Sequence, residues 1–190
     1  QRLIVNKTYK LFVGGKFPRT ESGRYYELRG KKEALLANVS RASRKDLRDA
    51  VVAARSSFAG WAGATAFLRG QVLYRVAEML EGRAQQFEEE LCSQGATPAG
   101  ARKEVASAVE LFVHYAGWSD KYGALFSTVN PVGTPHFNFS RPEPTGVVAA
   151  VVPGGTGLLG LCSALAPILV GGNACVLLAS HQKPLCAITL

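Results

Sequence analysis

The sequence predicts an α/β fold, and three features of the chain lead to that prediction. Residues 144–180 contain no charged side chain, yet seven glycines and three prolines interrupt them. This pattern is typical of a buried strand, helix and strand rather than of one membrane-spanning helix. Helical spacing of apolar residues recurs before this stretch, and a Gly-Gly pair near the N-terminus indicates a tight hairpin. With 190 residues, 47% of them hydrophobic, the chain can bury the core of one domain or of part of a larger one.

The hairpin is expected in residues 11–17, where Gly14 and Gly15 supply the positive φ angles that a two-residue turn needs. Residues 23–28 are expected to form a strand that pairs nearby.

The first helix is expected to begin after Ser43, which acts as its N-cap, with Asp46 near the positive end of the helix dipole. Trp61 closes this helix. Apolar residues at helical spacing define its expected buried face: Leu47, Val51, Ala54 and Phe58.

Two further helices are expected, one from about Ala66 to Ser93 and one from about Ala101 to Tyr122. Gly95 ends the first of them. Its expected buried stripe consists of Leu68, Val72, Val76, Met79 or Leu80, Phe87 and Leu91. The aromatic residues near the end of the other helix are interpreted as packing residues, and His114 as structural.

The segment that follows is β-rich and punctuated by proline. Phe137-Asn138-Phe139-Ser140-Arg141 alternates apolar and polar side chains, as a half-exposed strand does. We expect residues 129–141 to form strand structure that pairs with another segment or subunit, because an unpaired strand edge leaves N–H and C=O groups open. His136 is interpreted as a surface strand residue rather than a ligand.

The net charge of +8 is concentrated near the N-terminus. Residues 1–60 hold 14 Lys and Arg against 5 Asp and Glu, whereas residues 61–190 hold 8 against 9. A basic segment can bind nucleic acid or an anionic membrane. However, no RNA-recognition motif, zinc finger or basic heptad helix accompanies these charges, so we expect a solvated face and neither kind of partner. The residues concerned are Lys7, Lys10, Lys16, Arg24, Lys31, Lys32, Arg44 and Arg48.

The cysteines predict neither a metal site nor a disulfide framework. They lie far apart, no C-x-x-C occurs and no signal peptide precedes them. Free thiols in a reducing compartment are the simplest interpretation, which favours the cytoplasm. The four residues are Cys92, Cys162, Cys175 and Cys186.

A glycine-rich turn follows the expected strand at Val147 to Val152. Gly155-Thr156-Gly157-Leu158-Leu159-Gly160 matches G-x-G-x-x-G, the turn that places a dinucleotide pyrophosphate at a helix N-terminus in Rossmann-type folds. The dinucleotide-binding motif also requires an acidic residue about 20 positions further on, which binds the ribose. No Asp or Glu follows Glu143 in this chain. A glycine-rich turn without a ligand is the competing interpretation.

The frame around this turn resembles the aldehyde dehydrogenase superfamily. There, a Gly-Val-Val strand ends in Pro-Trp-Asn-Phe-Pro, and a second strand ends in Lys-Pro-(Ala/Ser)-Glu-x-Thr-Pro-Leu. Residues N-terminal to this frame agree as well, above all Tyr115-Ala116-Gly117-Trp118-Ser119-Asp120-Lys121, which resembles the family's Tyr-Ala-Gly-Trp-Ala-Asp-Lys. The retained scaffold positions are Gly146, Val147, Pro153, Leu165, Ala166, Pro167, Gly172, Asn173, Val176, Pro184 and Leu185.

The resemblance does not extend to the positions whose side chains bind the oxyanion and the cofactor in the family. Its Trp-Asn pair, whose Asn donates to the oxyanion, aligns with Gly154 and Gly155. Its Lys and Glu, which bind ribose hydroxyls of NAD, align with Leu178 and His181. We therefore expect a degenerate pocket at Pro153, Gly154, Gly155, Leu178 and His181, with no catalytic, metal or confident cofactor-binding residue and no bound cofactor.

The resemblance also implies a domain plan. Residues 1–190 are expected to be a fragment, the N-terminal part of one aldehyde dehydrogenase-like domain, with the nucleophilic Cys and the base lying beyond Leu190. Within it, 1–124 form the hairpin and three helices, 125–144 form oligomerisation-type strands, and 145–190 begin a Rossmann-type cofactor-binding sheet.

Two main functions follow from the resemblance. The first is a non-catalytic domain with a structural or assembly role, which looks like the second, degenerate half of the sixteenth aldehyde dehydrogenase family. Its partners would be other dehydrogenase-like domains of the same chain, a homodimer partner or another protein. The alternative is an NAD(P)-dependent aldehyde dehydrogenase with altered cofactor contacts, in which Lys183 and His181 meet a 2′-phosphate. A nucleic-acid or anion-binding module is a third hypothesis.

Overall fold

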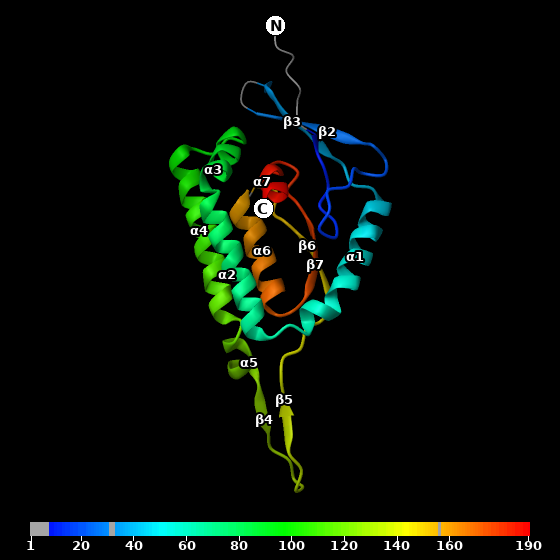
Figure 1. Ribbon diagram of the computed structural model, residues 1–190, viewed down its shortest axis with the longest axis vertical. Helices are drawn as coiled ribbons and strands as arrows, with labels where there is room; N and C mark the ends of the chain where they lie inside the picture. The colour runs from blue at the N-terminus through cyan, green and yellow to red at the C-terminus, as the bar shows by residue number, and fades with distance from the viewer. Residues whose placement is uncertain (1–7, 31–32, 156) are drawn as a thin grey trace.

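The computed structural model describes residues 8–30, 33–155 and 157–190. A small sheet lies at one end, helices flank two parallel strands in the middle, and a β-hairpin projects from the other end (Figure 1). Thr156 of the glycine-rich motif and Lys7, Lys31 and Lys32 of the basic segment lie outside the described residues.

The expected strand–helix–strand unit is present. It consists of β6 (Val147–Val151), α6 (Leu158–Val170) and β7 (Ala174–Leu178). The two strands pair in parallel, with Val147 beside Ala174 at one end. Helices α6 and α1 (Arg44–Ala62) lie on either side of this strand pair (Figure 1). The predicted α/β fold is thereby confirmed.

The helical layer differs from the prediction in its boundaries. The helix predicted from Ala66 to Ser93 is in fact two helices, α2 (Ala66–Gly82) and α3 (Ala84–Ser93). They are separated by Arg83, whose φ of −113° and ψ of 15° leave the helical region. Gly82 directly before it is a weak helix former, which favours a break there.

The next predicted helix also shifts. Helix α4 (Pro98–Trp118) starts earlier than expected, because Thr97 caps it and Pro98 fits its first turn. A short α5 (Lys121–Phe126) follows as a separate helix.

The buried stripe of α2 also differs from the predicted one, although Leu80 is buried and Val76 is half-buried as predicted. Leu68, Val72 and Met79 are largely exposed, because α4 packs on the adjacent face. A side chain at Gly70 would lie 3.0 Å from the Ala116 carbonyl oxygen, so this glycine permits close packing of the two helices. The face that is buried consists of Arg69, Gly70, Leu73, Ala77 and Leu80.

The predicted buried faces of α3 and α1 agree better with the structure. Phe87 and Leu91 of α3 are buried as expected. On α1, Ala54 is buried and Val51 and Phe58 are half-buried, whereas Leu47 is exposed, contrary to prediction.

The N-terminal sheet contains two strands, β1 (Thr8–Tyr9) and β3 (Leu35–Ser40), that were not predicted from the sequence. The hairpin turn is confirmed, with Gly14 and Gly15 at φ 58° and 75°. However, β2 (Tyr25–Arg29) pairs not with this hairpin but antiparallel with β3. The two-residue strand β1 pairs in parallel with the other edge of β3.

Two hydrophobic clusters meet at the C-terminal helix α7 (Leu185–Thr189). The larger cluster joins α2, α3, α4 and α6 and includes Cys186. The smaller one lies under the N-terminal sheet and includes Leu185. Consecutive residues of α7 therefore enter both clusters.

The projecting arm is formed by β4 (Thr128–Asn130) and β5 (Asn138–Ser140), which pair antiparallel (Figure 1). This confirms strand structure within residues 129–141. His136 lies in the exposed connection between the strands rather than in a strand, which corrects the prediction. In the part of the chain that the structure describes, no helix combines the length and hydropathy that crossing a membrane requires.

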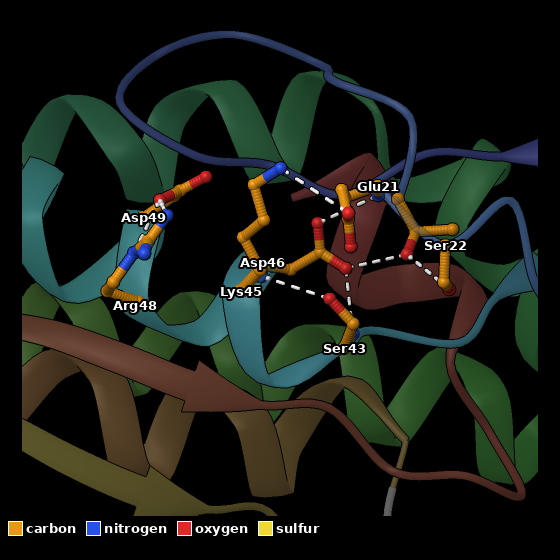
Figure 2. A network of polar contacts seen from close by, with 8 residues as sticks. Glu21, Ser22, Ser43, Lys45, Asp46, Arg48 and Asp49 are labelled. Carbon is orange, nitrogen blue, oxygen red and sulfur yellow. Dashed lines mark hydrogen bonds and ion pairs between the residues drawn. The ribbon is translucent and has the colours of Figure 1, made fainter.

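Asp46 joins the start of α1 to the N-terminal segment (Figure 2). One carboxylate oxygen accepts from the Glu21 N–H at 3.0 Å, and the other accepts from the Thr20 hydroxyl at 2.6 Å and the Ser43 N–H at 2.7 Å. Burial raises the pKa of Asp46, but these hydrogen bonds outweigh it and lower the pKa from its ordinary 3.8 to about 2. The ionised carboxylate is thus part of the fold.

Replacing this carboxylate should cost stability in a pH-dependent way. Because the pKa of folded Asp46 lies below its unfolded value, its contribution is full above about pH 5 and disappears as the pH falls through about 2. Asp46→Asn should therefore lower the free energy of unfolding by about 2 kcal/mol at neutral pH, with the difference closing toward pH 2. Chemical denaturation from pH 7 to 2 measures this.

The matched control is Asp49→Asn, since Asp49 is exposed and pairs with the neighbouring Arg48 at 3.3 Å. It should change stability by less than about 0.5 kcal/mol. Equal losses in both variants, or a loss in Asp46→Asn that does not change with pH, would contradict the role given to Asp46.

Candidate functional site

The structure brings the predicted pocket residues together at one edge of the parallel strands. Pro153, Gly154 and Gly155 form the exposed turn between β6 and α6. Leu178 ends β7 beside them, and its carbonyl accepts from the Val152 N–H at 2.9 Å. The carboxyl ends of parallel strands are where open α/β sheets bind ligands. Pro153, Gly154, Gly155 and Leu178 therefore lie at this end of the strand pair.

Two side chains that follow β7 hold the glycine turn. The Ser180 hydroxyl donates to the Gly154 carbonyl at 2.7 Å, and the Lys183 ammonium donates to the Gly155 carbonyl at 3.0 Å. The Lys183 N–H in turn donates to the Ser180 hydroxyl at 3.1 Å. This arrangement was not predicted from the sequence, although a Ser hydroxyl that bonds a nearby backbone N–H is a recognisable turn pattern.

A carboxylate from α4 occupies the N-terminal end of α6. Oε1 of Glu104 accepts from the Leu159 N–H at 3.1 Å. The first N–H groups of a helix, at its positive end, are the groups that would receive a phosphate. Here one of them already binds an anion of the same chain. Glu104 was not predicted from the sequence, because it lies 55 positions from its partner and has no local signal.

The two positions aligned with ribose-binding groups have different surroundings. Leu178 is 60% exposed and has neither a donor nor an acceptor on its side chain. The His181 ring lies 4.3 Å from the ring of Tyr26 in β2, and the Tyr26 hydroxyl donates to the His181 carbonyl at 3.1 Å. Burial raises the pKa of Tyr26, which keeps it a donor. His181 thus connects the end of β7 to the N-terminal sheet.

A groove of about 740 Å³ opens next to the glycine turn, between α4 and α6. Its polar side chains are Lys103, Glu104, Ser107 and Ser163. A second groove, of about 430 Å³, lies at the opposite end of α6 and is lined mainly by aromatic and proline side chains. Of these two grooves, the first borders the predicted pocket.

The cysteines have no feature of a nucleophile or ligand set. All four are free thiols. Burial raises the pKa of Cys162 to about 12 and also raises that of Cys186, so both are protonated at neutral pH. Within the described ranges, no three His, Cys, Asp or Glu side chains are grouped so that they could hold a metal ion.

Comparison with known proteins places this geometry in context. The profile of the aldehyde dehydrogenase family matches residues 18–190. Cytosolic 10-formyltetrahydrofolate dehydrogenase of Mus musculus is 31% identical over 99% of this chain, and an aldehyde dehydrogenase of Aspergillus niger is 30% identical over 92%. The chain spans 22% and 35% of the lengths of these two proteins.

The solved structures agree with the sequence comparisons. An NAD+ complex of an aldehyde dehydrogenase from Bacillus cereus superposes with a TM-score of 0.90 at 28% identity. The superposition covers 96% of this chain and 38% of that one.

Gly157 provides a test of how tightly the turn is packed. A β-carbon there would lie 2.5 Å from Leu91 Cδ2 and 3.0 Å from Glu104 Oε1. Gly157→Ala should therefore displace the Glu104 carboxylate or the buried Leu91 and lower the free energy of unfolding by about 1–3 kcal/mol. Thermal or chemical denaturation measures the loss.

Gly155→Ala is the control, because a β-carbon at Gly155 would meet no atom within 4 Å. It should stay within about 0.5 kcal/mol of the unsubstituted protein. If the two variants are equally stable, the close approach of α3, α4 and the turn is not a constraint.

Proposed function

The chain belongs to the aldehyde dehydrogenase family, and we propose that it is a degenerate, non-catalytic domain of that family with a structural role in protein assembly. We further propose that it corresponds to the second half of the two-domain members of the sixteenth family. The observation that carries the proposal is that groups of the same chain already bind the glycine turn. Its carbonyls and the adjacent helix N-terminus are engaged by Ser180, Lys183 and Glu104.

The residues at the pocket are a poor fit for a dinucleotide. A ribose placed at Leu178 would lose hydrogen bonds to water and gain none, which costs about 1–3 kcal/mol for each unpaired group. His181 faces the Tyr26 ring, and the Lys183 ammonium is bonded to the Gly155 carbonyl. A nucleotide phosphate that bound through either side chain would therefore compete with contacts that the chain already makes.

The turn also lacks the amide side chain that the family is expected to use to stabilise an oxyanion. Gly155 stands where the family's Asn is expected, and losing one such donor typically costs about a hundredfold or more in rate. A family scaffold without these donors supports a role in which the surface of the domain, rather than its pocket, is used.

The arm formed by β4 and β5 is the surface best suited to assembly. Every residue from 131 to 140 is exposed, and the Val129, Phe137 and Phe139 side chains are between 58% and 75% exposed. A two-stranded hairpin is only marginally stable alone. We propose that another dehydrogenase-like domain of the same polypeptide, or a second copy, covers this arm.

A second candidate function is that of an NAD(P)-dependent aldehyde dehydrogenase with altered cofactor contacts. Two observations favour it. A groove of suitable size opens at the glycine turn, and the Bacillus cereus relative binds NAD+ on the same fold. In that case Lys183 and His181 would turn toward a 2′-phosphate.

The cytoplasm is the proposed location. Four free thiols fit a reducing compartment, and the Mus musculus relative is named as a cytosolic protein.

Calorimetric titration with NAD and with NADP separates the two functions. We expect no saturable binding to the purified protein, because Leu178 offers no partner for a ribose and Lys183 is already engaged. A catalytically competent aldehyde dehydrogenase, titrated under the same conditions, is the positive control. A dissociation constant in the low micromolar range for either nucleotide would favour the enzyme over the structural domain.

The assembly role is tested by placing a charge on the arm. Phe139→Lys should convert an assembled species into a monomer, since a lysine is costly to bury in an apolar contact. Phe67→Lys on α2 is the matched control, because Phe67 is 69% exposed and lies outside the arm. Sedimentation velocity is the measurement. Monomers with the same thermal midpoint for all three proteins would refute the assembly role.

A further inference from the structure

Four arginines gather beside the Asp46 network, on the side of the molecule formed by β2, β3 and α1. The Arg41 N–H donates to the Arg24 carbonyl at 2.9 Å, one position beyond the last strand pair of Tyr25 with Ser40. Arg24 and Arg41 therefore lie opposite each other, one position beyond the paired residues of β2 and β3. The Thr20 hydroxyl contacts the Arg41 carbonyl at 3.3 Å, which brings Arg19 to the same place.

The fourth member, Arg44, is the first residue of α1, whose start is joined to residues 20 and 21 through Asp46 (Figure 2). We call Arg19, Arg24, Arg41 and Arg44 the arginine cluster. All four residues are exposed. The network of Figure 2 thus fixes the backbone segments from which the four side chains extend.

The acidic side chains around the arginine cluster already form ion pairs or hydrogen bonds with other groups of the chain. Glu21 pairs with Lys45 at 3.3 Å and Asp49 with Arg48 at 3.3 Å. The Asp46 oxygens accept from a hydroxyl and from backbone N–H groups. Across residues 8–30, 33–155 and 157–190, none of the four arginine side chains forms an ion pair or a hydrogen bond.

This arrangement carries an energetic penalty inside the chain. Like charges at directly opposite positions of an antiparallel ladder repel each other, and Arg24 and Arg41 occupy such positions. A carboxylate placed between two guanidinium groups would replace this repulsion with charge-assisted, often bidentate hydrogen bonds. The arginine cluster therefore has the chemistry of a receptor for carboxylates.

We infer that the arginine cluster is a docking surface for an acidic segment of a partner protein. This role goes beyond the proposed function and is independent of the state of the glycine turn. Tyr25 beside the cluster is 58% exposed, and Tyr and Arg are the residue types enriched at protein interfaces. Discrete carboxylates on a peptide can face the arginines while avoiding Glu21 and Asp49 at the border, which a continuous phosphate backbone cannot do.

The test compares two variants with the same loss of charge. One is Arg24→Gln/Arg41→Gln/Arg44→Gln in the arginine cluster. The control is Arg55→Gln/Arg75→Gln/Arg102→Gln, three exposed arginines on α1, α2 and α4. A fluorescein-labelled oligoglutamate peptide is the probe, and fluorescence anisotropy at low and physiological salt gives its affinity for the purified protein. Thermal midpoints establish that both variants are folded.

The cluster variant should bind the peptide about tenfold or more weakly, whereas the control should stay within about twofold of the unsubstituted protein. Equal weakening in the two variants would reveal a nonspecific response to net charge and overturn the inference. Absence of binding by the unsubstituted protein would overturn it as well. A labelled oligouridylate that binds more tightly than the peptide, and is lost only in the cluster variant, would replace the acidic protein with a nucleic acid.

Discussion

The buried guanidinium of Arg69 fixes the frame on which the candidate site is built. Its three nitrogens donate to the Ala64 carbonyl at 2.6 Å, the Val170 carbonyl at 3.2 Å and the Tyr122 hydroxyl at 3.2 Å. Through them α2 is joined to the turn before it, to the end of α6 and to α5. The positive charge also lies at the negative end of the α6 dipole, which compensates part of the cost of burying it. Because α6 is held at this end, its other end presents the glycine turn in a fixed position.

The elements that could be predicted from the sequence are those whose signals are local. Ser43 and Asp46 form a capping box, and Gly14 and Gly15 take the positive φ angles of a tight turn, so both are evident from neighbouring residues. The α2 stripe could not be predicted in this way. The residues on its buried face include an arginine, a glycine and an alanine, which give a weak apolar signal, and the packing of α4 selects that face. Strand β3 was not predicted, although Ala37-Asn38-Val39-Ser40 alternates apolar and polar residues.

In the candidate site, too, local motifs could be predicted from the sequence but tertiary contacts could not. Gly154, Gly155, Leu178 and His181 were identified from their places in a known frame. Their partners were not, because Ser180 reaches Gly154 across 26 positions, Lys183 reaches Gly155 across 28 and Tyr26 reaches His181 across 155. A missing side chain is evident from an alignment of motifs, but the contacts that the backbone of the turn makes are set by tertiary packing. The glycine turn is therefore better described by its contacts to Ser180, Lys183 and Glu104 than by what it lacks.

Helix α7 has a consequence for how the molecule opens. It contains only five residues, yet Leu185 packs under the N-terminal sheet and Cys186 packs among the helices. The Thr189 hydroxyl also donates to the Glu90 carboxylate of α3 at 2.6 Å. A local opening that lifts the sheet must therefore either expose Leu185 to water or pull α7 out of the helical cluster. We therefore expect hydrogen exchange in the sheet and in the helices to be coupled through α7.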